Sequence, residues 1–122
     1  MYEILFYENK RGNSEILEYM RFLQENTCKE NRMKSKKIAS LLDLLKVKGL
    51  SLGEPYLKHL REEIWELRPL KDRILLASVK YHRIILLTIF RKETKKTPES
   101  EILRVKMALI DFLERTDENE KA

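Results

Sequence analysis

The feature that most restricts the fold is an apolar run in the second half of the chain. Residues 84–90 read Ile-Ile-Leu-Leu-Thr-Ile-Phe, with an arginine on either side at positions 83 and 91. A strand that is apolar on both faces is normally central in its sheet and covered on both sides. With 122 residues, the chain can bury one core without disulfides or metals. We therefore expect a single α+β domain built around this strand.

Two more strands are predicted directly before this run, at residues 64–68 and 73–80. The connections at 69–72 and 81–82 are so short that they permit only antiparallel hairpins. The N-terminal residues 2–7 also read as a strand.

Three helices complete the predicted fold. The first is capped by Asn13 or Ser14. The second covers residues 31–48 and ends at Gly49, where glycine tolerates a left-handed conformation, and a loop follows. The third opens with Thr97 as its cap and a proline at its first position. The predicted buried faces consist of Ile16, Met20 and Leu23 in the first helix, Ile38, Leu41, Leu42 and Leu45 in the second, and Ile102, Val105, Leu109, Phe112 and Leu113 in the third.

Together these elements give the order β-α-α-β-β-β-α, with two N-terminal helices and a mainly antiparallel sheet. We expect one domain over residues 1–115 and a polar, frayed tail over 116–122. No apolar stretch approaches the ~18 residues of a membrane span, and the first residues lack the features of a signal peptide. Cys28 is the only cysteine, which excludes an intramolecular disulfide. We therefore expect a cytoplasmic protein with no membrane partner.

The positive charge is concentrated within the domain. Residues 67–98 contain nine basic and two acidic residues, which is a net charge of +7, whereas the whole chain carries +5. A basic block inside a domain, rather than on a tail, indicates a polyanion held in a shaped site. The alternative is a charged face that is simply solvated, since 37% of the chain is charged.

The predicted hairpins bring several of these cations together. The end of one antiparallel strand lies beside the start of the next. Arg68, Arg73 and Arg91 are therefore predicted to converge near one sheet edge, with Lys71 in the turn between the first two. Alternation places Arg73 on one face of its strand and Lys80 on the other.

The sequence contains no glycine-rich phosphate loop, no metal-ligand spacing and no signature of a serine triad. Catalysis by this chain would have to use arginine, lysine, a histidine and the substrate itself. RNA permits this because its 2′-hydroxyl is a nucleophile next to the scissile phosphate. Fixed cations can stabilise the charge that develops on the phosphate, and a lysine or a histidine can move protons.

Several short segments, taken in order, resemble the RelE/ParE toxin superfamily and, within it, the HigB-like branch and its phage-derived relatives. The resemblance implies a RelE-like fold and a ribosome-dependent mRNA endonuclease of a type II toxin–antitoxin system, with no cofactor. The implied partners are mRNA, the ribosome with its rRNA, and a helix-turn-helix, HigA-like antitoxin, with operator DNA bound only through the antitoxin complex. The segments that carry the resemblance are residues 64–68, 72–75, 86–87, 90–92, 94–98 and 101–102.

The resemblance also implies roles for individual residues. Arg73 would hold the scissile phosphate, Arg91 and Lys92 would act at the leaving group or transition state, and Arg68 would assist them. We expect Arg73→Ala to abolish toxicity without unfolding the chain. A wider set of residues is expected to bind RNA, the last three of them by docking on rRNA: His59, Lys58, Lys71, Lys80, Lys95, Lys96, Lys34, Lys36 and Lys37.

The chain departs from the family pattern at three places. Glu93 stands where a second lysine is common, residues 75–77 replace aromatic residues, and no tyrosine follows Pro98. Lys92, Lys95 and His59 are left as alternative proton carriers. Two other functions also stay open, namely inhibition of DNA gyrase as by ParE, and nucleic-acid binding without catalysis.

The antitoxin is expected to dock on the N-terminal helices. Aromatic side chains often carry protein interfaces, and Tyr19, Phe22 and Trp65 are the predicted anchors. This contact is predicted to be largely apolar, and charge is expected to contribute less to binding.

Overall fold

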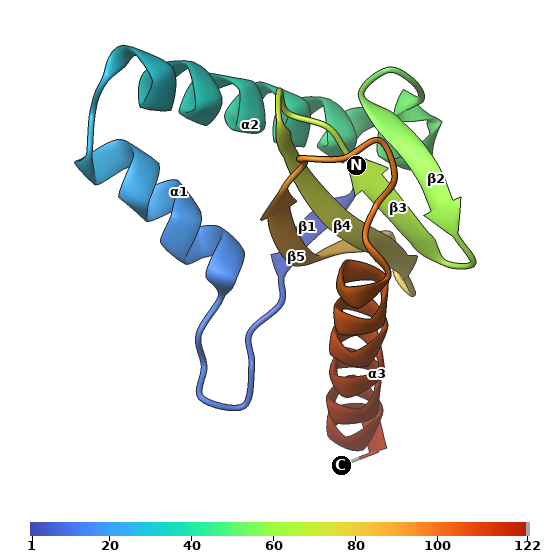
Figure 1. The fold of residues 1–122 in the computed structure, drawn as a ribbon. Helices are drawn as coiled ribbons and strands as arrows, with labels where there is room; N and C mark the ends of the chain where they lie inside the picture. Colours follow the sequence, from blue (N-terminus) through green and yellow to red (C-terminus); the bar gives the residue numbers. More distant parts are fainter. Residues whose placement is uncertain (122) are drawn as a thin grey trace.

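The computed structural model describes residues 1–121, and the side chains of residues 1–116. It is an α+β fold in which helices lie on both sides of one twisted sheet (Figure 1). In chain order the elements are β1 (Glu3–Phe6), α1 (Glu15–Glu25), α2 (Lys29–Lys48), the 3₁₀ turn η1 (Gly49–Leu52), β2 (Leu57–Arg61), β3 (Ile64–Leu67), β4 (Asp72–Val79), β5 (Arg83–Arg91) and α3 (Glu99–Lys121).

The sheet has the strand order β1-β5-β4-β3-β2. Only the β1–β5 pair is parallel, and the other three pairs are antiparallel, as the short hairpins predicted. Residues 84–88 of β5 are at most 2% exposed. The prediction of a strand that is covered on both faces is therefore confirmed.

Each face of the sheet has its own core. On one face, Ile74 and Leu76 of β4 pack with the apolar stripes of α1 and α2. On the other face, Leu75 and Ala77 of the same strand pack with Val105 and its neighbours on α3. The alternation predicted for β4 is confirmed, and it assigns one face of the sheet to the N-terminal helices and the other to α3.

Several local predictions are also confirmed. The Ser14 hydroxyl accepts a hydrogen bond from the amide of Leu17 and caps α1. The predicted buried stripe of α2 is 0–7% exposed. Gly49 ends α2 with φ of 56°, and a Cβ at this position would lie 2.4 Å from the ring of Tyr2. Glycine is thus required there both by its backbone conformation and by a close neighbour.

The predicted strand order missed β2, because no element was predicted for residues 56–63, between the loop after the second helix and the next strand. This edge strand reads Leu-Lys-His-Leu-Arg, and only Leu57 in it is buried. An edge strand rich in charge gives little periodic apolar signal, and such charge is typical of edges that resist pairing with other chains. The observed order is β-α-α-β-β-β-β-α.

Three predictions for the last helix were wrong. The helix begins at Glu99, so Pro98 precedes its first turn, and the Pro98 carbonyl rather than that of Thr97 accepts the first helical bond, from Ile102. The Thr97 hydroxyl donates to the buried carboxylate of Glu66 (2.7 Å). Leu113 is 41% exposed rather than buried. The backbone of α3 continues to Lys121, where a frayed tail was expected, whereas Ala122 and the side chains after Thr116 lie outside the described residues. None of the described helices has the length and hydropathy that a membrane span requires.

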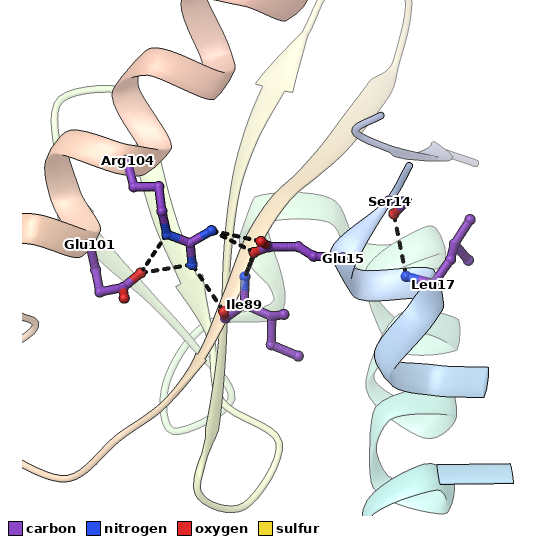
Figure 2. Close-up of polar contacts among 6 residues, drawn as sticks. All are labelled: Ser14, Glu15, Leu17, Ile89, Glu101 and Arg104. Carbon is purple, nitrogen blue, oxygen red and sulfur yellow. Dashed lines mark hydrogen bonds and ion pairs between the residues drawn. The ribbon is translucent and has the colours of Figure 1, made fainter. Parts of the chain in front are cut away.

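Side chains from two helices complete the edge of β5 beyond the end of β1. The β1–β5 pairing ends at Phe6 and Leu86. Further along β5, the amide of Ile89 donates to the carboxylate of Glu15 (2.8 Å), and its carbonyl accepts from Arg104 Nη2 (3.1 Å). Arg104 Nη1 also pairs with Glu15 at 2.7 Å, so α1, β5 and α3 are joined at one point (Figure 2).

We predict that Glu15→Ala lowers the free energy of unfolding by about 1 kcal/mol, because it removes the acceptor of the Ile89 amide. Urea denaturation measures the change. Glu18→Ala is the matched control, since Glu18 is also an acidic residue in the first turn of α1 and its side chain is exposed. Equal losses in the two variants would mean that only the interaction with the helix dipole was removed.

Candidate active site

The start of β4 and the end of β5 form an open cavity lined mainly by cations. Its volume is about 710 Å³. Asp72 pairs with Arg91 and Arg73 with Phe90 in the sheet register, which brings the two arginines to the same end of the sheet. We call this hollow the cation cavity; it is lined by Lys71, Arg73, Arg91, Lys92, Glu93, Thr94 and Lys95.

The register thus confirms the predicted convergence for Arg73 and Arg91, but at a different location in the sheet. β4 is the middle strand of the five, so the cations gather at an end of the central strands and not at a lateral edge of the sheet. No residue of a described helix is among those that line the cavity. Arg68 is not among the residues that line the cavity, because its guanidinium turns toward Glu66.

A buried carboxylate lies behind the cavity. The side chain of Glu66 on β3 is 2% exposed. It accepts hydrogen bonds from Arg68 Nε (3.0 Å) and from the Thr97 hydroxyl (2.7 Å), and its Oε1 lies 3.8 Å from Arg73 Nε. One carboxylate thus holds the end of β3, the start of β4 and the loop before α3. A charge this deeply buried needs such partners.

Arg73 is held rigidly rather than exposed at a rim. Its side chain is 13% exposed, and its Nη1 donates to the carbonyls of Leu70 (2.7 Å) and Asp72 (2.8 Å). Burial lowers the pKa of this guanidinium from its ordinary value, and the neighbouring Glu66 opposes that shift. Among the described residues Nη2 has no hydrogen-bond partner. The group is oriented in advance and retains donor capacity for a ligand.

A second buried carboxylate, Asp72, connects the cavity to α1. Asp72 is 4% exposed and accepts a hydrogen bond from the Tyr19 hydroxyl at 2.7 Å. Burial, together with this bond and the charge of Asp72, strongly raises the pKa of Tyr19, while the nearby Arg91 acts in the opposite direction. The Tyr19 hydroxyl is therefore bound within the fold. The sequence predicted Tyr19 as an anchor for a partner, and this hydroxyl is not free for that contact.

The other cations of the cavity are not paired with a carboxylate among the described residues. Within the described part of the chain, Lys71, Arg91, Lys92 and Lys95 form no ion pair. A cavity with several unneutralised cations around one fixed guanidinium is suited to bind a phosphate group. Nowhere in the described residues do three His, Cys, Asp or Glu side chains gather as a metal ion would need.

Besides Arg68, Lys96 and the three predicted lysines of α2, the structure leaves Lys80, Lys58 and His59 outside the cavity. Lys80 lies in the turn after β4, at the opposite end of an eight-residue strand from Arg73, which is roughly 20 Å away. Lys58 and His59 lie on the edge strand β2. The His59 ring packs against Trp65 with centroids 4.9 Å apart, and its Nε2 contacts the carbonyl of Glu62. His59 therefore does not line the cation cavity, whereas Lys92 and Lys95 do.

The three lysines predicted on α2 differ from one another. Lys34 pairs with Glu30 at 3.4 Å and its side chain is 15% exposed. Lys37 lies over the ring of Tyr56, 5.0 Å from its centroid. Lys36 is exposed and makes no ion pair within the described chain. Lys96 follows Lys95 in the loop, where its carbonyl accepts from the Thr94 hydroxyl.

The predicted aromatic anchors do not form one exposed surface. Phe22 is 52% exposed on α1, whereas Trp65 is half-buried on β3 and packs against the core. Sequence reasoning also missed Glu66 and Asp72 as the groups that organise the site. Alternation from Arg68 places Glu66 on the same face of the strand, which is the one available signal.

Arg73→Ala is expected to destabilise the fold by about 2–4 kcal/mol, because it leaves the buried Glu66 with fewer cations and two carbonyls without a donor. Arg91→Ala and Lys92→Ala, which remove unpaired side chains, should change stability by about 0.5 kcal/mol or less. Thermal melting of the three variants compares them. An unchanged melt for Arg73→Ala would contradict the role given to its contacts and restore the expectation from the sequence.

Comparison with known families adds one finding. A family model described as "Phage derived protein Gp49-like (DUF891)" matches residues 28–109, that is, 82 of the 122 residues. The matched segment runs from the start of α2 into α3 and contains every residue that lines the cation cavity. No curated protein matches the chain.

Proposed function

Because the chain belongs to the phage-derived Gp49-like family, a family of RelE/ParE-like toxins, we propose that it is a HigB-like toxin that cleaves mRNA on the ribosome. The observation that carries this proposal is the cation cavity. Binding to a protein such as gyrase does not require converging, unpaired cations, whereas a scissile phosphate does.

The proposed reaction is a transfer within the RNA. The 2′-oxygen attacks the adjacent phosphorus, the bond from phosphorus to the 5′-oxygen breaks, and the products end in a 2′,3′-cyclic phosphate and a 5′-hydroxyl. One proton leaves the 2′-hydroxyl and one must reach the 5′-oxygen. We assign these transfers to Lys92 and Lys95, two of the lysines that line the cavity.

The arginines would supply electrostatic stabilisation. Arg73, which two carbonyls and Glu66 hold in place, would bind a non-bridging oxygen without reorganisation during the reaction. Arg91 is exposed and unpaired within the described chain, and it would neutralise the charge added in the transition state. Preorganised donors of this kind account for a large part of enzymatic rate enhancement.

A toxin needs an inhibitor, and we propose a helix-turn-helix antitoxin that also carries the complex to operator DNA. A contact surface is offered by Phe22 and by the mainly apolar groove between α1 and α2, which includes Leu23 and Met33. The rim of this groove carries Lys29, Arg32 and Lys36, so charge is expected to contribute more to the complex than the sequence suggested.

Expression of the protein without an antitoxin should arrest growth, with protein synthesis failing before DNA synthesis. Incorporation of labelled methionine and labelled thymidine after induction measures the two rates. Continued translation with stalled replication would indicate gyrase inhibition instead and would contradict the proposal.

In a reconstituted translation reaction, the purified protein should cleave mRNA on ribosomes. Arg91→Ala and Lys92→Ala should each slow cleavage by about 10²–10³-fold, because each removes a cation from the transition state. Lys48→Ala is the control, since Lys48 is an exposed lysine at the C-terminal end of α2 and does not line the cavity. Wild-type cleavage by Arg91→Ala would refute the assignment of the site.

A further inference from the structure

A second hollow lies beside the cation cavity, between α2 and the turn that joins β3 to β4. Its volume is about 410 Å³, and we call it the α2 groove; it is lined by Met33, Lys36, Lys37, Ser40 and Leu70. The turn passes close to the middle of α2 (Figure 1). Leu70 lines the groove and Lys71 lines the cation cavity, so one turn separates the two hollows.

Leu70 has an unusual conformation for a leucine. Its φ is 58° and its side chain is 46% exposed. A residue with a Cβ in this left-handed region costs on the order of 1 kcal/mol. The backbone conformation has a structural purpose, because the Leu70 carbonyl accepts from Arg73 Nη1. The exposed apolar side chain has no such explanation, since glycine or asparagine would fit the same turn.

Met33 lines the groove together with this leucine, and Tyr56 contacts Lys37, another of the lining residues. Met33, across the groove, is 54% exposed. Tyr56 is 38% exposed, its ring lies under Lys37, and its carbonyl accepts from the amide of Arg68 (2.9 Å). The groove thus has apolar walls next to lysines, and no carboxylate is among its lining residues.

The turn itself is firmly placed relative to the cavity. The amide of Asp72 donates to the carbonyl of Pro69 (3.1 Å), and the amide of Lys92 donates to the carbonyl of Lys71 (2.8 Å). A ligand bound in the α2 groove would therefore lie at a fixed distance from a phosphate bound in the cation cavity.

Building on the proposed function, we propose that the α2 groove is a subsite for one nucleotide of single-stranded RNA, next to the nucleotide whose phosphate occupies the cation cavity. Leu70 and Met33 contact its base, while Lys36 and Lys37 contact its phosphate. Apolar or aromatic contacts with bases, combined with cations along the backbone, are the usual means of binding single-stranded nucleic acid. This subsite takes over the base contact that the aliphatic residues 75–77 cannot make, since they are buried in β4.

RNA fits this groove better than an acidic segment of a protein. A single turn separates the groove from the cation cavity, and this arrangement matches a ligand with regularly spaced phosphates and bases. It is also lined by few side chains, so it accommodates one base rather than the face of a helix.

Fluorescence anisotropy with a labelled hexanucleotide tests the subsite. The probe carries 2′-fluoro groups, which remove the nucleophile, and a second set of probes has one abasic position each. The wild type should lose affinity when one particular base is missing. Leu70→Ala should bind the complete probe at least about fivefold more weakly, and it should no longer discriminate against that abasic probe. Leu103→Ala, which shortens a leucine that is 61% exposed on α3, should behave as wild type.

Each outcome of this binding experiment either supports or overturns the proposed subsite. Wild-type affinity and discrimination in Leu70→Ala, with an unchanged thermal melt, would overturn the subsite, while the cleavage assay with Arg91→Ala would still test the proposed function separately. Absence of any RNA binding by the wild type would overturn it as well. A synthetic helical peptide with glutamates on one face and leucines on the other tests the alternative occupant. If Leu70→Ala weakens binding of the peptide and not of the RNA, the groove is a protein-docking surface and the proposal is wrong.

Discussion

The candidate site depends on the buried carboxylate of Glu66. Its bonds to Arg68 and Thr97 and its closeness to Arg73 compensate the cost of removing a charge from water. Without it, mutual repulsion would favour separation of the cations. A negative charge inside the protein therefore allows a positively charged surface to exist in one geometry. Asp72 has a comparable effect on the other face of the sheet, where it holds Tyr19.

The two carboxylates also link the site to the architecture. Glu66 joins β3 to the loop before α3, and Asp72 joins β4 to α1. Glu15 and Arg104 then connect α1 and α3 through the backbone of Ile89 on β5 (Figure 2). Both layers of helices are thus attached by polar contacts to the strands that carry the cavity residues. A site that must hold a phosphate in one position requires this kind of support.

The sequence predicted those elements whose apolar residues repeat with the right period. Sequence reasoning found strands β3, β4 and β5 and the buried stripe of α2, because their buried residues follow the apolar pattern of a strand or the spacing of a helix. Strand β2 has a single buried residue, Leu57, and so left no comparable pattern. The parallel pairing of β1 with β5 could not be read from the sequence, because it joins distant segments.

The candidate site was predictable in part. The hairpins indicated that Arg73 and Arg91 lie at the same end of the sheet, and the register agrees. The net charge of a segment does not tell at which end of a strand a cation lies, so Lys80 was grouped with residues far from it. Glu66 and Asp72 were overlooked because in a sequence a buried carboxylate cannot be distinguished from a solvated one.

The parallel pair has a consequence for the order in which the molecule is assembled. Glu3 pairs with Arg83, a residue 80 positions later, so the first strand to leave the ribosome has no partner until β5 has been made. The apolar side chains of α1 and α2 must wait for the same strands, since their core includes Ile84 and Leu86. Long-range pairing of this kind delays folding. During synthesis the nascent chain therefore lacks an assembled cation cavity, and its cations come together only after β4, β5 and the loop that follows them have been made.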